Sequence, residues 1–111
     1  MVKSPCRPAL LAAQLTRCGA AVVVVGGTAR WLRSGGGRPR DLDVVVDPLS
    51  VPALVRALAA LGVAARVVAV LRCRDVRFDT GWGPLDVFVD DCPPSTAVLV
   101  EGVPVAVMVA E

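Results

Sequence analysis

The stretch that decides the fold is AAVVVVGGTARWLRSGGGRPRDLDVVV, residues 20–46. It opens with a continuous, largely β-branched run, Ala20–Val25, which is typical of a strand buried on both faces of a sheet. Two glycines end that run, and the pattern over Thr28–Ser34 then indicates a short helix. A glycine-rich loop follows and leads to a second strand, predicted over Asp41–Val46. The stretch therefore predicts a strand, a helix and a strand in close succession.

The flanking sequence extends this pattern to an α/β or α+β domain. Helices are predicted over Pro8–Cys18 and Val51–Leu61, because leucines recur three or four residues apart and a glycine follows each segment. Further strands are predicted over Ala65–Leu71, Arg74–Thr80, Leu85–Val89 and Val103–Val109. The expected order, α-β-α-β-α-β-β-β-β, predicts a mixed β-sheet backed by helices.

Length and composition restrict the classes of function. A chain of 111 residues is one ordinary domain, and we expect residues 1–111 to form it. The hydrophobic fraction of 55% excludes an intrinsically disordered chain. An aromatic fraction of 4% argues against a surface on which single-stranded bases stack. A net charge of +2 gives no reason to expect broad, non-specific nucleic-acid binding.

We expect the protein to be cytoplasmic and not to span a membrane. Val51–Leu71 is long and apolar, but Arg56, Gly62 and Arg66 interrupt it. An arginine at the centre of a membrane helix costs about 2.5–3.5 kcal/mol. Four cysteines occur without a C-x-x-C pair or any histidine, so they are interpreted as free thiols, with a disulfide as the alternative. They are Cys6, Cys18, Cys73 and Cys92.

The glycine pair Gly26-Gly27 lies between a buried strand and a helix. Unpaired backbone N–H groups at a helix N-terminus favour an anion, and a residue without Cβ lets a phosphate approach closely. Taken alone, the pair is explained more simply by a tight turn from strand to helix. Arg38 and Arg40 follow in the loop, where they would attract a triphosphate or simply be solvated.

Aspartates interrupt two of the apolar strands. Asp41 and Asp43 are two residues apart and project from one face of a strand, an arrangement that suits carboxylates holding a pair of metal ions. Asp86 lies within another apolar run and would add a third carboxylate, with Asp79 as its rival. Oxygen ligands favour Mg²⁺ or Mn²⁺. The alternative is that these are hydrated strand ends, and for Asp47 we expect a role in the turn before Pro48.

Together these motifs resemble the DNA polymerase β-type nucleotidyltransferase superfamily. The resemblance rests on Val25-Gly26-Gly27, thirteen further residues, Asp41-Leu42-Asp43, and the segment GWGPLDV over residues 81–87. It is strongest to small bacterial members, including nucleotidyltransferase-like toxins of toxin–antitoxin and abortive-infection systems. It covers residues 10–109, without the C-terminal helices into which relatives usually continue.

The resemblance implies a role for each matching residue. Gly26 and Gly27 would hold the β- and γ-phosphates of a nucleoside triphosphate. Asp41 and Asp43 would bind Mg²⁺ or Mn²⁺. Asp86 would bind the catalytic metal and help to activate an attacking hydroxyl. Many relatives have serine directly after the first glycine.

In this chain the hydroxyl stands one position later, at Thr28, which becomes a candidate nucleotide contact.

Three functions are therefore considered. The first is transfer of a nucleoside monophosphate from a nucleoside triphosphate to an unknown acceptor (RNA, protein or small molecule), as an enzyme or as the toxin of a toxin–antitoxin pair. The second is a catalytically degenerate module that binds a nucleotide or a protein on the same fold. The third is a structural domain with acidic strand ends. A helix-poor C-terminal edge additionally favours a homodimer or a protein partner.

Overall fold

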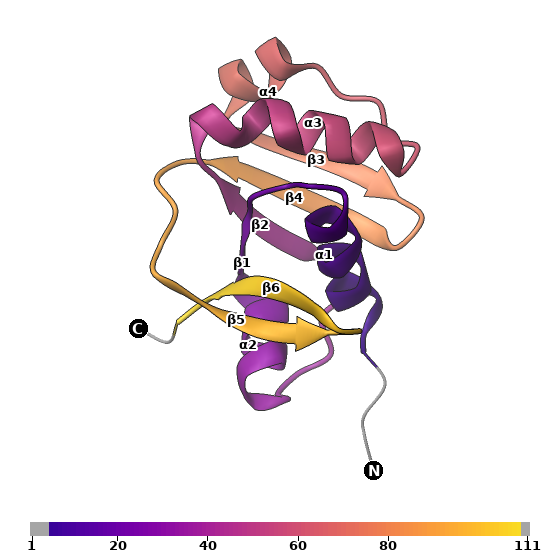
Figure 1. Cartoon of the computed structure of the whole chain (residues 1–111), viewed down its shortest axis with the longest axis vertical. Helices are drawn as coiled ribbons and strands as arrows, with labels where there is room; N and C mark the ends of the chain where they lie inside the picture. Colours follow the sequence, from indigo (N-terminus) through magenta and orange to yellow (C-terminus); the bar gives the residue numbers. More distant parts are fainter. Residues whose placement is uncertain (1–4, 110–111) are drawn as a thin grey trace.

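A six-stranded mixed sheet organises residues 5–109, the part of the chain that the computed structural model describes (Figure 1). Its strands are β1 (Val23–Val25), β2 (Leu42–Val46), β3 (Asp75–Thr80), β4 (Gly83–Val89), β5 (Ser95–Val100) and β6 (Val103–Met108). They lie in the order β3-β4-β2-β1-β6-β5. The β1–β6 and β2–β4 pairs are parallel, and the other neighbouring pairs are antiparallel. The prediction of a mixed α+β domain is confirmed.

Four α-helices accompany the sheet within the described residues. They are α1 (Arg7–Arg17), α2 (Gly26–Ser34), α3 (Val51–Ala60) and α4 (Val67–Cys73), and a short 3₁₀ turn, η1 (Pro48–Ser50), precedes α3. The Asp47 side chain begins η1 by accepting a hydrogen bond from the Leu49 N–H at 3.0 Å, which is the turn role expected for it. None of these helices is long and apolar enough to cross a membrane.

The core lies between one face of the sheet and helices α1 and α3, which Figure 1 shows in front of the strands. Alternate residues of the central strands face this core and are buried, and leucines of both helices pack against them. The fully buried leucines and valines of β2, β4, α1 and α3 include Leu42, Val44, Leu85, Val87, Leu11, Leu15, Leu54 and Leu58. The intervening residues of β2 and β4 consequently project from the opposite face.

The prediction of a strand over Ala65–Leu71 is wrong, because helix α4 covers the segment from Val67 onward and continues to Cys73. An apolar run this short does not distinguish a strand from a helix by periodicity. A strand buried on both faces would need several covered side chains, whereas only Val70 of α4 is buried and Val68 is 59% exposed. The helix ends at Arg74, whose φ of 59° is left-handed and whose N–H bonds to the Val70 carbonyl.

Strand β5 was not predicted from the sequence. It forms a hairpin with β6 through the two-residue turn Glu101-Gly102, in which both residues have positive φ, at 51° and 77°. Two apolar runs separated by two residues with glycine second are a hairpin signal, although glutamate is an unusual first residue for it. The sequence therefore predicts the correct number of strands after the third predicted helix, but for the wrong reason. It includes Ala65–Leu71, which is not a strand, and omits β5.

Candidate functional site

The three predicted aspartates, Asp41, Asp43 and Asp86, are hereafter called the aspartate cluster. Strands β2 and β4 run parallel, and Asp43 stands directly opposite Asp86 in their register. Their neighbours along each strand are buried in the core, so both carboxylates project from the other face. Asp41 directly precedes β2 and shares the parity of Asp43. The structure therefore brings all three carboxylates to one face of the sheet.

An arginine that was not predicted as a site residue joins this cluster. Arg77 on β3 stands opposite Asp86 in the antiparallel β3–β4 register. One terminal nitrogen, Nη1, lies 3.2 Å and 3.5 Å from the two carboxylate oxygens of Asp86. The other, Nη2, lies 3.3 Å from Oδ2 of Asp41. Its only sequence signal was the alternation of charged and apolar residues along β3, which placed it on an exposed face.

The three carboxylates differ in their access to solvent. The side chain of Asp41 is 40% exposed and that of Asp86 is 18% exposed, while Arg77 is 54% exposed. The ion pairs are thus accessible to water, and an exposed ion pair of this kind contributes at most about 1 kcal/mol to stability. A competing cation can therefore displace Arg77 at small cost.

Asp43 is held in the least favourable environment for a negative charge. Burial raises its pKa above the ordinary value of 3.8, and a hydrogen bond with Asp86 raises it further. The charges of Asp86 and Asp41 act in the same direction, and Arg77 opposes them. With every group ionised, three carboxylates and one guanidinium leave a net charge of −2. The cluster therefore favours an additional proton or cation.

Gly26 is required where Asp43 meets the start of α2. It has a φ of 68°, and a Cβ at this position would lie 2.7 Å from Oδ2 of Asp43. Any larger residue would adopt a strained backbone and push against the carboxylate. Gly27 is different, because its added Cβ would meet nothing closer than Pro39, at 3.9 Å. Packing and backbone conformation therefore explain why residue 26 is glycine, but they do not explain why residue 27 is glycine.

Thr28 acts on Asp41 through the backbone. Its side chain is 1% exposed, and its hydroxyl donates a hydrogen bond to the Asp41 carbonyl at 2.8 Å. This bond ties α2 to the residue that enters β2. The hydroxyl predicted as a nucleotide contact is therefore engaged in positioning Asp41.

The remaining predicted residues are exposed, in the loop before β2 and on β3. Arg38 and Arg40 are exposed in the loop between α2 and β2, and Arg40 immediately precedes Asp41. Asp79, the rival of Asp86, is exposed on β3 opposite Pro84. It does not share the Asp43–Asp86 register position.

The chemistry of the cluster was compared with that of a divalent-metal site. Three carboxylates supply the hard oxygen donors that Mg²⁺ and Mn²⁺ take, and their net charge fits a divalent cation. In the arrangement described, Asp41 and Asp86 are bound to Arg77, and no group of three or more acidic, cysteine or histidine side chains within residues 5–109 is arranged to hold a metal ion. The donors fit the metal, provided that Arg77 releases them.

Comparisons with known proteins add nothing to this geometry. Family models, curated proteins and solved structures were all searched, and none matches this chain. The assignment of a function therefore depends on the aspartate cluster and the glycines beside it.

Proposed function

We propose that this chain is a metal-dependent nucleotidyltransferase of the DNA polymerase β type, which transfers a nucleoside monophosphate from a nucleoside triphosphate to an acceptor. One observation carries the proposal. Asp43 and Asp86 stand in register on adjacent parallel strands, with Asp41 on the same face, beside a helix that begins with two glycines. A structural domain has no reason to place three carboxylates together where two of them, Asp41 and Asp86, raise the cost of ionising the third, Asp43.

The aspartate cluster would hold Mg²⁺ or Mn²⁺. When bound, such an ion offsets the negative charge that develops on phosphoryl oxygens and on the leaving pyrophosphate. The Asp43 carboxylate lies in the space that the missing Cβ of Gly26 leaves open, and Asp41 is positioned through its carbonyl by Thr28. The exposed N-terminus of α2, at Gly26 and Gly27, would receive phosphate oxygens.

Three arginines are assigned two further roles, attraction of the triphosphate and neutralisation of the aspartates. Arg38 and Arg40 are exposed in the loop before β2 and would attract a triphosphate without ordering it. Arg77 holds Asp41 and Asp86 in place when no metal is bound, and it must leave them when metal binds. Toxicity to the producing cell, as in a toxin–antitoxin pair, is an extension of this proposal that depends on the acceptor.

A second candidate function is favoured by Arg77 itself. Its two ion pairs place a fixed positive charge where a metal would act. A degenerate relative would keep this arrangement permanently and bind a nucleotide or a protein without catalysis. The two candidates differ in one measurable property, since only the first requires metal for nucleotide binding.

Thermal unfolding tests this difference. Each of the four nucleoside triphosphates at millimolar concentration, with Mg²⁺, should raise the melting temperature if it binds. A ligand present at 100 times its Kd stabilises the folded state by about 2.7 kcal/mol. Asp43→Asn and Asp86→Asn should abolish the metal-dependent shift, while the matched change Asp79→Asn on β3 should preserve it.

Each result has a definite meaning. A shift that is lost with a chelator supports the nucleotidyltransferase, and a shift that survives the chelator supports the degenerate module. If none of the triphosphates shifts the unfolding temperature, both nucleotide-binding functions are excluded. If Asp79→Asn abolishes the shift and Asp86→Asn does not, the third carboxylate has been assigned to the wrong residue.

A further inference from the structure

The outer edge of the sheet at β5 has the properties of a surface that pairs with itself. The geometry points to a homodimer in which β5 of one copy adds antiparallel to β5 of a second copy, joining the two sheets into one. The dimer is independent of the nucleotide chemistry, because β1 and β6 separate β5 from β2, the nearest strand of the aspartate cluster.

The two edges of the sheet differ in their protection against strand pairing. The edge strand β3 carries three exposed charged residues, Asp75, Arg77 and Asp79, which is a usual way to prevent pairing with another chain. The edge strand β5 has the sequence STAVLV and carries no charge or proline. Ser95–Ala97 are exposed, and Leu99 is 72% exposed. Only the β5 edge is thus left open to another strand among the described residues.

Alternate residues of β5 direct their backbone N–H and C=O groups away from β6, toward the open edge of the sheet. The Val109 N–H bonds to the Pro94 carbonyl, so even-numbered residues here direct their backbone groups toward β6. The alternation of an antiparallel ladder continues this pattern along the hairpin to Val100. The N–H and C=O groups of Ser95, Ala97 and Leu99 therefore point away from the sheet and are available to a further strand.

These outward groups allow a two-fold symmetric pairing centred on Ala97. In that register Ala97 stands opposite its own copy, and Ser95 of each chain stands opposite Leu99 of the other. A symmetric antiparallel pair brings the same strand against itself, so any charged side chain at the centre would face an identical charge. The neutral sequence of β5 avoids this repulsion, and a small alanine lies at the symmetric position.

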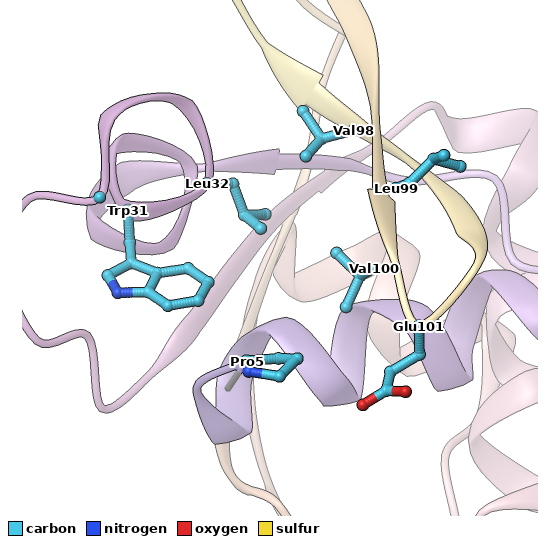
Figure 2. Close-up of a pocket in the computed structure, with 8 residues that line it drawn as sticks. Pro5, Trp31, Leu32, Val98, Leu99, Val100 and Glu101 are labelled. Atoms are coloured by element: carbon cyan, nitrogen blue, oxygen red, sulfur yellow. The ribbon is translucent and has the colours of Figure 1, made fainter. Parts of the chain in front are cut away.

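A pocket of about 500 Å³ adjoins this edge (Figure 2). It is lined by Trp31 and Leu32 of α2 and by consecutive residues of β5, Val98 to Val100. Figure 2 shows Val98 and Val100 on the side of α2, with Leu99 directed away from Trp31. The pocket continues to Glu101, in the turn that ends β5. A second strand paired with β5 would lie next to this pocket and bring its own apolar side chains close to it.

A second copy is a better occupant than a strand of unrelated sequence. The exposed side chains of β5 contain no charge that would select an oppositely charged partner. Pairing with an identical strand satisfies both sets of outward backbone groups at once and covers Leu99 on both chains. The edge is thus free of charge repulsion against its own copy and complements itself in hydrogen bonding and in its apolar residues.

Sedimentation equilibrium of the full chain between 1 and 200 µM tests the dimer. The wild type should approach twice the chain mass of 11.5 kDa. Ala97→Lys and Ala97→Glu should each raise the dimer Kd at least about tenfold, because identical charges then face each other across the two-fold axis. An equimolar mixture of these two variants should restore the dimer. Val68→Lys, an equivalent change at an exposed valine of α4, should dimerise like the wild type.

Several outcomes would overturn the inference. The first is a wild type that remains monomeric at 200 µM, which would leave the β5 edge to a different partner. The second is an Ala97→Lys variant that dimerises as tightly as the wild type, which would place the interface elsewhere. If Ala97→Lys fails to fold, as judged by circular dichroism, the test is a comparison of the dimer Kd of Ala97→Glu with that of its uncharged counterpart, Ala97→Gln. Equal dimer Kd values for these two would also refute the pairing.

Discussion

Substitution of Gly26 by alanine tests the close approach of Asp43 to the start of α2. Gly26 has a left-handed backbone, with a φ of 68°, at the first residue of α2. Its missing Cβ leaves the space in which Oδ2 of Asp43 lies, since a Cβ would be 2.7 Å from that oxygen. Gly26→Ala therefore introduces two separate costs, one in the backbone and one at the carboxylate.

The magnitude follows from these two costs. A left-handed conformation costs an L-residue with a Cβ about 1–2 kcal/mol. The clash adds less, because the obstructing oxygen is the end of a side chain that can rotate away. We expect a loss of at least about 1–2 kcal/mol in unfolding free energy and a melting temperature lowered by at least about 5–10 °C. The rotation also displaces the Asp43 carboxylate, so metal-dependent nucleotide binding should fall further than stability does.

Urea unfolding followed by the fluorescence of Trp31 and Trp82 measures the loss, and Gly27→Ala is the matched control. Gly27 does not have a left-handed φ. A Cβ added there would have Pro39 as its nearest neighbour, at an ordinary contact distance of 3.9 Å. Gly27→Ala should unfold at the same urea concentration as the wild type or a higher one, since alanine favours a helix by up to about 1 kcal/mol over glycine. It should nevertheless weaken nucleotide binding if phosphate approaches this residue.

The double variant Gly26→Ala/Asp43→Ala isolates the clash. Removal of the Asp43 carboxylate relieves the contact but leaves the backbone cost, so the combined loss should be smaller than the sum of the single losses. Equal stability of Gly26→Ala and Gly27→Ala would refute the conformation assigned to Gly26. Strict additivity in the double variant would refute its contact with Asp43.

Three further predictions concern the same cluster. Because the folded-state pKa of Asp43 is raised, the folded protein binds a proton more tightly than the unfolded chain does, and stability is lost as pH rises from 3.8 through the raised pKa. Asp43→Asn should remove this component of the pH dependence and be at least as stable as the wild type at pH 7, as urea titrations at a series of pH values would show. Thr28→Val should lose about 1–3 kcal/mol of stability by removing the part-buried hydrogen bond from the Thr28 hydroxyl to the Asp41 carbonyl, whereas Thr28→Ser should lose less. Arg77→Met should tighten Mn²⁺ binding measured by calorimetry, because Arg77 no longer competes for Asp41 and Asp86; weaker binding would show that Arg77 supports the metal site.

The sequence predicted those parts of the fold in which local pattern and tertiary environment agree. β1, α2 and β2 were expected within two or three residues of their ends, because a glycine pair and a loop punctuate the apolar runs. Helix α4 was mistaken for a strand because its apolar residues are consecutive, and only the packing of Val70 determines which face is buried. Strand β5 was missed because its stability comes from pairing with β6, which lies later in the chain.

The sequence was sufficient to predict the aspartates of the candidate site, but not the arginine that pairs with them. Asp43 and Asp86 were identifiable because a carboxylate within an apolar strand is unusual. Their register, and hence their direct opposition, depends on β2 and β4 being neighbours, which sequence spacing alone does not specify. Arg77 was overlooked because an exposed arginine on an edge strand looks like ordinary surface until the β3–β4 hairpin places it opposite Asp86.

The most direct test of the proposed activity is transfer of label from α-labelled nucleoside triphosphates. The wild-type chain, Mg²⁺ and a pool of total cellular RNA and protein as acceptors would be incubated with each labelled triphosphate in turn. The wild type should label an acceptor, and Asp43→Asn should reduce the rate at least about a hundredfold while its circular dichroism and unfolding remain intact. Labelling by Asp43→Asn at the wild-type rate, or no labelling by the folded wild type with any of the four triphosphates, would contradict the assignment of this chain as a nucleotidyltransferase.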